Sequence, residues 1–551
     1  MIHKLKKYIL STLVILICQF ANAQNTVGTT FVTSDVYDGF TLLNIGTNSY
    51  LINNCGEVMN EWNSVYPPGN AVYLLPNGNL LRAGRVESGS SISMGGAGGI
   101  IELFDWNGNL IWSYLYNDEN NRQHHDVYPM PNGNVLILAA TIMTEEEAID
   151  AGRDPNLLPD NRLYNEQIIE VEPIGAAQAN IVWEWNIKDH LIQDFDNSKL
   201  NFGNVANSPE KLDINFLNGA SGSENWLHFN SIQYDEELDQ IVISCRNLSE
   251  IYIIDHSTTT QEAATSNGGT YGKGGDLLYR WGNPQAYQQG TAEDRTLFGQ
   301  HTPYFIEPGL DDEGKIMLFN NGFQRTPEFS EVLILTPPTN TPGFYTIENE
   351  SAYGPVSADY IYSDLSENPS PFYSHIVSSA QRLPNGNILI CEGISGRIFE
   401  IDENENLVWE YQNPESNSNN TAVNQGEEAP GNNLLFRATK YASDYPAFTN
   451  HELTPGEPLE GNPDLTQCNN VLSQQDFEIT DVNIYPNPTS GTLYIKTDFP
   501  IEELNVFDLN GKKMLKQKMT DQLDVSNLDS GIYFLVLKNG SNYITKKIVK
   551  R

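Results

Sequence analysis

The tetrapeptide Pro-Asn-Gly-Asn occurs three times, and it constrains the fold more than any other feature of the chain. Its copies begin at Pro76, Pro131 and Pro384, and each lies between two short apolar runs. Asn-Gly between two such runs is a strong signal for a β-hairpin, with positive φ expected at both central residues of the turn. The three copies therefore predict three hairpins of one repeating unit.

The segments around these hairpins predict a unit of four antiparallel strands. An acidic and apolar run follows most hairpins, as in residues 100–105, 168–172 and 397–402, and a further run often ends in tryptophan. We interpret the tryptophans as core residues between units. About five full units, and one divided between residues 41–62 and 433–441, predict a six-bladed β-propeller in an all-β chain.

Net charge limits the partners that the protein can bind. The 551 residues carry a formal charge of −40, which argues against nucleic acid because phosphate contacts need clustered lysine and arginine. Residues 24–477 contain 18 basic and 62 acidic side chains, a balance of −44. We interpret this charge as a solvated surface suited to a salty exterior, where screening is strong.

The N-terminus predicts export, and the cysteines fit an oxidising compartment. Residues 1–23 have a basic start, an apolar stretch and an Ala-Asn-Ala cleavage site, as in a secretory signal. No other segment approaches the roughly 20 apolar residues of a membrane span, so none is expected. Cys55 and Cys468 are the better candidates for a disulfide, whereas Cys245 and Cys391 lie in apolar runs and are expected to be buried thiols.

The last segment, residues 478–551, is nearly neutral, with 10 basic and 9 acidic side chains. It contains the motifs Y-P-N-P-T-S-G, N-V-F-D-L-N-G-K and L-D-S-G-I-Y-F-L and the ending K-K-I-V-K-R. In this order they resemble the C-terminal sorting domain of the type IX secretion system of Bacteroidetes. The resemblance implies a small β-sandwich that the secretion machinery carries to the cell surface or the medium. The expected divisions are a signal at 1–23, the propeller at 24–455, a linker at 456–477 and the sorting domain at 478–551.

Five of the nine histidines recur at the start of the first strand of successive units. The first strand of a propeller blade lines the central channel, so these side chains are expected to converge on one axis. Arg246 ends the second strand of one hairpin, and Arg85 takes the same place in the first unit. A guanidinium beside imidazoles favours a bound sulfate or phosphate over a metal ion. The five histidines are His124, His125, His228, His301 and His375; His190, His256 and His451 have no motif and are expected to be surface residues.

Two motifs carry a second resemblance. H-F-N-S-I followed by I-V-I-S-C-R, and Q-H-T-P before I-M-L-F-N-N-G, are similar to the bacterial aryl-sulfate sulfotransferase family over about residues 40–450. The resemblance implies a six-bladed propeller that transfers a sulfuryl group from a phenolic ester to a phenol without a nucleotide sulfate donor. It also implies that His301 is the nucleophile and becomes a sulfohistidine, and that His228, Asn230 and Arg246 hold the sulfate oxygens and assist proton transfer.

The same residues suit this chemistry on physical grounds. Neutral imidazole is a competent nucleophile near pH 7, and Arg246, Asn230 and a second imidazole can stabilise charge on the sulfate oxygens. A protonated histidine can serve the leaving phenolate. The predicted catalytic residues are His301, His228, Arg246 and His125, and the predicted substrate-binding residues are Asn230, His124, His375 and Arg85. One histidine of the pair 124–125 matches the family's first channel histidine, and the sequence leaves open which one.

Other functions stay open at this point. No metal site and no cofactor are expected, although the acidic loops at residues 154–160 and 311–313 leave calcium open. The chain has no C-x-P-x-R sulfatase motif and no phosphate loop for a nucleotide sulfate. The alternatives are hydrolysis, with water as acceptor, and a non-catalytic surface propeller that binds polysaccharide or protein.

Overall fold

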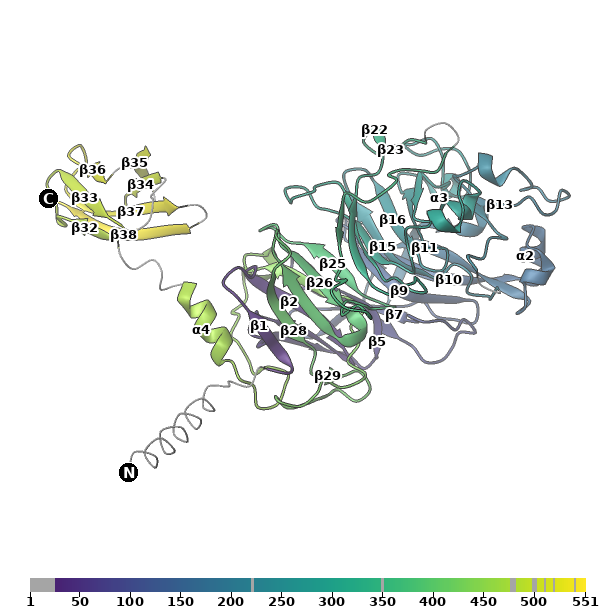
Figure 1. Ribbon diagram of the computed structural model, residues 1–551, viewed down its shortest axis with the longest axis horizontal. Helices are drawn as coiled ribbons and strands as arrows, with labels where there is room; N and C mark the ends of the chain where they lie inside the picture. Colours follow the sequence, from purple (N-terminus) through teal and green to yellow (C-terminus); the bar gives the residue numbers. More distant parts are fainter. Residues whose placement is uncertain are drawn as a thin grey trace, which may run out of the picture. The chain divides into compact units, whose positions relative to one another are not determined.

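The computed structural model describes residues 25–219, 222–347, 351–475, 482–497, 503–509, 512–518, 521–539 and 542–551. The chain divides into two compact units, Met1–Cys468 and Asn469–Arg551. Strands dominate both units, which confirms the predicted all-β class (Figure 1). The predicted signal, residues 1–23, lies outside the described residues. None of the helices in the described ranges combines the length and the apolar character that crossing a membrane requires.

Six antiparallel sheets of four or five strands make up most of the first unit. In chain order they are β31 (Thr439–Ala442) with β2 (Gly39–Ile45), β3 (Asn48–Ile52) and β4 (Val58–Asn63); β5 (Pro68–Leu74), β6 (Leu80–Arg85), β7 (Gly99–Phe104) and β8 (Leu110–Leu115); β9 (Asn121–Pro129), β10 (Val135–Thr144), β11 (Arg162–Ile174) and β12 (Gln178–Asn186); β15 (Phe229–Asp235), β16 (Gln240–Cys245), β17 (Glu250–Asp255) and β18 (Tyr279–Trp281); β19 (His301–Phe305), β20 (Ile316–Asn320), β21 (Glu331–Leu335) and β24 (Tyr360–Tyr362); and β25 (Ser379–Arg382), β26 (Ile388–Glu392), β27 (Arg397–Ile401), β28 (Leu407–Gln412) and β1 (Gly28–Val32).

Shorter elements lie in the connections between these sheets. Three two-stranded sheets pair β13 (Leu191–Ile192) with β14 (Leu212–Asp213), β22 (Thr339–Thr341) with β23 (Phe344–Tyr345), and β29 (Glu415–Ser416) with β30 (Thr421–Ala422). Among the described residues the helices are α2 (Glu145–Asp150), α3 (Thr260–Ala263) and α4 (Thr466–Gln475), of which α4 follows the last of these sheets, and 3₁₀ turns lie at Pro155–Leu157, Ile187–His190, Val205–Asn207, Pro284–Tyr287, Ala292–Asp294, Gly393–Ser395 and Pro446–Phe448.

Strands from the two ends of the first unit complete two of the sheets. β31 pairs with β2, in a register that places Thr41 opposite Lys440. β1 pairs with β28 and adds a fifth strand to the last sheet. The predicted division of one unit between the two ends of the chain is therefore confirmed. Because the far end supplies the first strand of the first sheet, the first unit cannot finish folding until residue 442 is available.

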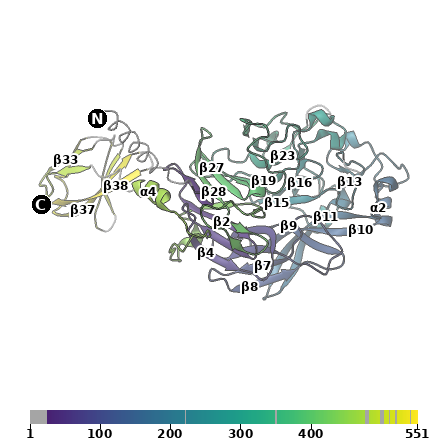
Figure 2. The same ribbon diagram turned by 60° about the horizontal axis from the view of Figure 1, so that its bottom comes forward.

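The first strands of the six sheets contact one another in sequence. β5 contacts β9, β9 contacts β15, β15 contacts β19, and β19 contacts β25. Figure 2 labels β9, β15 and β19 of this series. Gln381 on β25 exchanges hydrogen bonds with the backbone of Lys440 on β31. The hydroxyl of Tyr441 on β31 bonds the amide of Leu74 on β5. Residues that begin these strands are thus brought toward one another although they lie far apart in the sequence.

Buried tryptophans join five of the six sheets to the next one. Each donates its indole N–H to a group of the following sheet or of the loop beside it, and this packing confirms that the tryptophans are core residues. The pairs are Trp62 with Asp105 O (2.9 Å), Trp112 with Gln178 O (2.9 Å), Trp183 with Thr258 Oγ1 (3.1 Å), Trp185 with Gly275 O (2.8 Å), Trp281 with Pro355 O (2.7 Å) and Trp409 with Asn54 O (2.8 Å).

The three Pro-Asn-Gly-Asn segments form hairpin turns as predicted, but by a different geometry. Only the glycine has positive φ, at +86° in Gly78, +89° in Gly133 and +89° in Gly386. In the first copy the Gly78 amide donates to the Leu75 carbonyl (2.9 Å), and the Leu75 amide donates to the Asn79 carbonyl (2.8 Å). The hydrogen bond that closes the turn thus comes from the amide of the left-handed glycine. Proline is the second residue of the turn, and its ring holds its own φ negative. The expectation of positive φ at both central residues was wrong.

A disulfide joins Cys55 to Cys468, as predicted, and the two cysteines are 413 positions apart in the sequence. Cys245 and Cys391 are buried free thiols, also as predicted. Cys468 lies on helix α4, so the expected linker at residues 456–477 contains a helix that is covalently tied to the first unit.

The second unit consists of two sheets around one apolar core. One sheet is β32 (Asn483–Tyr485), β33 (Thr492–Lys496) and β36 (Gln522–Asp524), and the other is β35 (Lys513–Lys518), β34 (Glu503–Phe507), β37 (Gly531–Asn539) and β38 (Asn542–Lys550). Alternate residues of β33 and β37 are buried, including Leu493, Leu535 and Leu537. Alternation of buried and exposed residues is typical of a strand with one face on a core. This arrangement agrees with the expected small sandwich.

Candidate functional site

Three histidines from three successive sheets lie close together, and two of them flank one aromatic ring. His125 lies on β9, His228 directly precedes β15, and His301 begins β19. The rings of His125 and His228 meet edge to face, with centroids 4.7 Å apart. The Phe436 ring lies 6.3 Å from His125 and 6.4 Å from His301, measured between centroids. The predicted convergence of these three side chains is therefore present in the structure, and we call them the histidine cluster.

Arg246 brings a positive charge to the histidine cluster. Its backbone amide bonds the His228 carbonyl (3.2 Å), and its guanidinium lies over the Phe323 ring, 4.6 Å from the centroid. Within the part of the chain that the structure describes, no carboxylate lies within ion-pair distance of Arg246. Other buried arginines, such as Arg82 and Arg280, are each paired with a glutamate, whereas the Arg246 guanidinium donates to Oδ1 of Asn247 (3.3 Å). An unpaired guanidinium in a strongly acidic protein is suited to an anionic ligand.

Burial and the field of Arg246 keep the clustered imidazoles neutral. Burial, and next the positive charge of Arg246, lower the pKa of His301 to about 3, against the opposing effect of the Asn321 hydrogen bond. Burial also holds the pKa of His228 well below its ordinary value, with Arg246 the next cause. The pKa of His125 is lowered well below its ordinary value by burial and then by His228. The cluster therefore offers unprotonated nitrogens at neutral pH, as a nucleophile requires.

Hydrogen bonds fix which nitrogen of His301 carries the proton. Its Nδ1 lies 2.7 Å from Oδ1 of Asn321, whose Nδ2 donates to the carbonyls of Ser374 and Val377. Because Oδ1 can only accept, the His301 proton is on Nδ1. Nε2 therefore carries the lone pair, and it accepts a 3.2 Å hydrogen bond from the Val377 amide.

The adjacent pair His124 and His125 is resolved by its hydrogen bonds. The two Nδ1 atoms are 2.9 Å apart, and His124 Nε2 lies 3.0 Å from Oε2 of Glu166 on β11. Both nitrogens of His124 are therefore engaged, whereas His125 faces His228 and Phe436. His125 is the member of the pair that belongs to the histidine cluster. His124 lies behind it and has no free ring nitrogen for a substrate.

A glycine run packs directly against the two imidazoles. A Cβ atom on Gly96 would lie 2.1 Å from Nε2 of His125, and one on Gly95 would lie 3.5 Å from Cε1 of His228. Gly96 has φ of +71°, and its carbonyl accepts the amide of His125 at 2.7 Å. Only glycine combines this backbone conformation with so close an approach.

His228 and Asn230 have partners of their own. Asn225 Nδ2 lies 2.7 Å from His228 Nδ1, which places the His228 proton on Nε2. Asn230 is fully buried, and its Nδ2 donates to the carbonyl of Gln300, the residue before His301. Its Oδ1 has no hydrogen-bond partner among the described residues. Asn230 therefore ties β15 to the start of β19.

The backbone at the site is also unusual. His125 and His228 have φ of +51° and +54°, and Thr302, next to His301, has φ of +50°. Register irregularities interrupt β9, β15 and β19 beside these residues. Left-handed residues other than glycine, asparagine and aspartate are uncommon and concentrate at functional sites, where the fold holds them in place.

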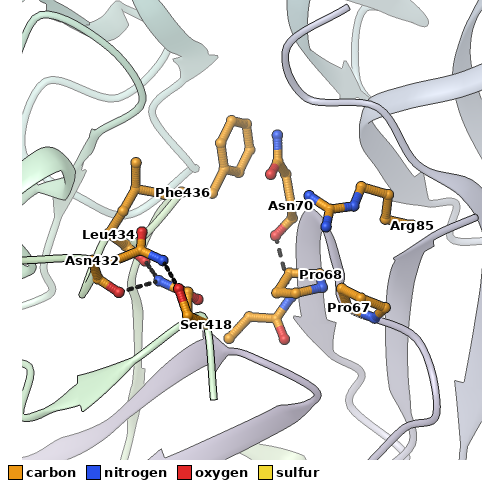
Figure 3. A pocket seen from close by; sticks show the side chains of 10 residues that line it. Pro67, Pro68, Asn70, Arg85, Ser418, Asn432, Leu434 and Phe436 are labelled. Atoms are coloured by element: carbon orange, nitrogen blue, oxygen red, sulfur yellow. Dashed lines mark hydrogen bonds between the residues drawn. The ribbon is translucent and has the colours of Figure 1, made fainter. Parts of the chain in front are cut away.

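Arg85 and His375 lie away from the histidine cluster. Arg85 is about half exposed, pairs with Glu87 (2.8 Å), and lines a cavity of about 450 Å³ (Figure 3). Asn70 lies beside Arg85 in this cavity, and Phe436 and Leu434 lie across from them. His375 is half-buried beside the Tyr373 ring. Because Phe436 lines the cavity and also lies beside His125 and His301, the cavity adjoins the cluster.

The three histidines without a motif are not simple surface residues. His190 is fully buried between Asp276 (2.7 Å) and the Ala263 carbonyl (2.8 Å). His256 is mostly buried between Asp239 (2.7 Å) and Glu170 (3.0 Å), and His451 stacks on Trp106. The expectation of surface positions was wrong for His190 and His256, because distant carboxylates satisfy their polar nitrogens inside the protein.

Sequence reasoning missed five residues that shape the site: Glu166, Asn225, Asn321, Gly96 and Phe436. Each lies 20 or more residues in sequence from the histidine that it contacts, apart from Asn225. The run of glycines at residues 95–99 is the one signal in the sequence that could have indicated a close approach.

Comparison with known proteins identifies two regions. The model of the family described as "Arylsulfotransferase (ASST)" matches residues 84–428, and that of the "Secretion system C-terminal sorting domain" matches residues 483–551. No curated protein matches the chain.

Two solved structures that are similar to the chain have TM-scores below 0.5. One is a Bacteroides caccae protein of unknown function (12% identity, 68% of this chain and 94% of that chain covered, TM-score 0.36). Another is a periplasmic gluconolactonase of Pseudomonas aeruginosa (9% identity, 68% and 95% covered, TM-score 0.34). The sorting domain indicates secretion, or display at the cell surface, through the type IX machinery. The family match covers more than half of the sequence, so the chain belongs to the arylsulfotransferase family.

Proposed function

We propose that the six sheets are the blades of a six-bladed β-propeller and that the histidine cluster lies in its central channel. The successive contacts of β5, β9, β15, β19 and β25 support this arrangement, as do the bonds that link β31 to β25 and β5. The tryptophans that join one sheet to the next also support it. First strands that meet in this way are expected to line a common axis.

The proposed activity is transfer of a sulfuryl group from a phenolic sulfate ester to a phenol, through a sulfohistidine at His301. One observation carries the proposal: an arginine without a carboxylate partner among the described residues stands beside three buried, neutral imidazoles in a region whose net charge is −44. The acidic surface does not attract an anion, so the local charge of Arg246 has to hold the ester. Membership of the arylsulfotransferase family supports a sulfotransferase-type function.

In the first half-reaction, Nε2 of His301 attacks the ester sulfur. An N–S bond forms, the bond between sulfur and the aryl oxygen breaks, and its electron pair leaves on the phenolate. Arg246 and the Nε2–H of His228 stabilise the charge that moves onto the sulfate oxygens. The Nδ1 proton of His301 stays on its hydrogen bond to Asn321. The Val377 amide must release Nε2 for the attack to occur.

His125 is the proposed proton carrier between the two half-reactions. The bound ester adds a negative charge that opposes the field of Arg246, which favours a proton on Nε2 of His125 in the complex. That proton passes to the leaving phenolate. In the second half-reaction the acceptor phenol returns a proton to the same nitrogen as its oxygen attacks sulfur, and the N–S electron pair goes back to His301. His125 takes its first proton from solvent as the donor ester binds and returns one to solvent as the product ester leaves, so the full cycle has no net gain or loss of protons.

The adjoining cavity is the proposed binding place for the aromatic ring of donor and acceptor. Phe436 and Leu434 on one side and Pro67 and Pro68 on the other give it apolar lining (Figure 3), against which a phenyl ring packs. Arg85 stands on the side of the two prolines, across from Phe436 and Leu434. We therefore assign Arg85 to the part of the substrate that lies outside the reacting group, not to the sulfate itself.

The test uses p-nitrophenyl sulfate as donor and phenol as acceptor. The protein is expected to release p-nitrophenol, to release it faster when phenol is added, and to carry sulfate label on His301 when the acceptor is withheld. His301→Asn is expected to abolish both release and label, whereas His451→Asn, which changes a histidine stacked on Trp106, retains them. Release that phenol does not accelerate would indicate hydrolysis. Absence of both release and label would contradict the proposal and favour a binding function.

A further inference from the structure

One carboxyl group, Glu166, contacts two of the three strands that carry the histidine cluster. It lies on β11, is almost fully buried, and its Oε1 accepts the backbone amide of Phe229 (2.9 Å), the residue directly after His228. Its Oε2 lies 3.0 Å from Nε2 of His124, which in turn reaches His125. Glu166 itself touches neither His125 nor any place that the proposed substrate occupies.

With His124 neutral and Glu166 ionised, the hydrogen bonds of this chain leave one arrangement of protons. Oε1 of Glu166 is an acceptor, and Oε2 faces Nε2 of His124, which must donate because two acceptors would repel each other at 3.0 Å. A neutral His124 then has its lone pair on Nδ1. That lone pair accepts a hydrogen bond from Nδ1–H of His125 across 2.9 Å. Nε2 of His125 is therefore the nitrogen without a proton.

We propose that Glu166 is a positioning residue that sets the tautomer of His125 through His124, so that Nε2 of His125 is free to exchange protons with phenols. The inference rests on the proposed function for its consequence but not for its geometry. The negative charge of Glu166, relayed by His124, also balances the positive charge that His125 acquires when it takes a proton. This arrangement resembles in logic the carboxylate that orients the histidine of a serine hydrolase.

The substitution Glu166→Gln is expected to reverse the tautomer of His125. The amide oxygen of the substituted side chain has to accept from the Phe229 amide, so its NH₂ group faces His124 Nε2 and forces that nitrogen to accept. His124 then carries its proton on Nδ1, His125 Nδ1 must accept, and the His125 proton moves to Nε2. The substitution keeps the size of the side chain and reverses the tautomer at the cluster. A merely structural role for Glu166 predicts no such reversal.

The experiment is ¹⁵N NMR of the mature protein labelled at histidine, because protonated and unprotonated ring nitrogens give well-separated shifts. The signals of His125 are assigned from the variant His125→Gln. We expect a proton on Nδ1 of His125 in the native protein and on Nε2 in Glu166→Gln. Glu170→Gln is the matched control: it lies four residues on along β11, is also buried, and bonds His256 instead. In this control His125 is expected to keep the native pattern.

Two results would overturn the inference: a native His125 with its proton on Nε2, or an unchanged pattern in Glu166→Gln. If Glu166→Gln does not fold, His124→Asn provides the second variant, since the Oδ1 of the introduced amide still accepts from His125 Nδ1–H. A His125 proton on Nε2 in that variant would also contradict the relay.

Kinetics keep this inference distinct from the proposed function. Glu166→Gln is expected to lower kcat with p-nitrophenyl sulfate and phenol by about 10²–10⁴-fold, the order found when an orienting carboxylate is lost. A reversed tautomer in a protein without sulfuryl transfer supports the relay and contradicts the function. Full sulfuryl transfer with an unreversed tautomer supports the function and contradicts the relay.

Discussion

Replacing Gly96 by alanine should disable the enzyme while leaving it folded. The new Cβ would lie 2.1 Å from Nε2 of His125, and ordinary contact begins near 3.4 Å, so the ring has to move by about 1.3 Å. Misplacement of a catalytic group by about 1 Å can cost a factor of ~10². The left-handed backbone adds a strain of about 1–2 kcal/mol, which a protein of this size should tolerate. We expect kcat with p-nitrophenyl sulfate to fall at least ~100-fold.

Substitutions at two further glycines separate the effect of steric collision from the effect of backbone strain. Gly133→Ala has a similar φ, +89°, but no atom lies within 4 Å of its Cβ, so it should lose stability and keep activity. Gly95→Ala meets only Cε1 of His228 at 3.5 Å and should keep most of both. Steady-state kinetics and denaturant unfolding of the three variants give the comparison. If Gly96→Ala retains the activity of Gly133→Ala, the assignment of His125 Nε2 to the reacting centre is refuted.

The remaining predictions concern Arg246, Phe436, His256 and the disulfide. Arg246→Lys should lower kcat/KM for p-nitrophenyl sulfate by about 10²–10³-fold, because lysine lacks the planar fork, and full activity would argue against sulfate at this position. Phe436→Ala should mainly raise KM for aryl donors; an unchanged KM would remove the ring from the cavity. Burial alone would lower the pKa of His256, but Asp239 and Glu170 raise it to about 9 from 6.5. The stabilisation that protonated His256 contributes is therefore complete below about pH 6.5 and is lost as pH rises through 9. The loss is at most about 3 kcal/mol, and it is smaller than this because Asp239 is partly exposed. Urea unfolding at pH 6 and 10 should show a larger loss of stability in the native protein than in His256→Gln, and equal losses in both proteins would contradict the prediction. Cys55→Ser with Cys468→Ser should lower the free energy of unfolding by about 2–5 kcal/mol, and an unchanged urea midpoint would show that the bond contributes no stability.

The repeat was readable from the sequence because its signals are local. Asn-Gly turns, strand-length apolar runs and terminal tryptophans each lie within a few residues of the element that they mark, and so the hairpins and the divided first sheet follow from them. The convergence of His125, His228 and His301 followed from their place in, or directly before, the first strands of three units.

The partners of these histidines could not be read in the same way. Glu166 reaches the site from the third strand of its sheet, and Phe436 reaches it from a segment near the far end of the first unit. Nothing in their own neighbourhood distinguishes them from ordinary strand or loop residues. The turn geometry was misjudged for a different reason, since the proline before Asn-Gly restricts φ and leaves only the glycine left-handed.

The bond between Cys55 and Cys468 has a consequence for export. Cys468 is the last residue of the first unit, so the bond can form only after the whole of that unit has reached an oxidising compartment. Oxidation of this pair therefore indicates that the exported chain contains the whole of the first unit. It also means that a protease cutting between residues 468 and 483 would release the sorting domain and leave a first unit whose early and late segments are joined by the disulfide.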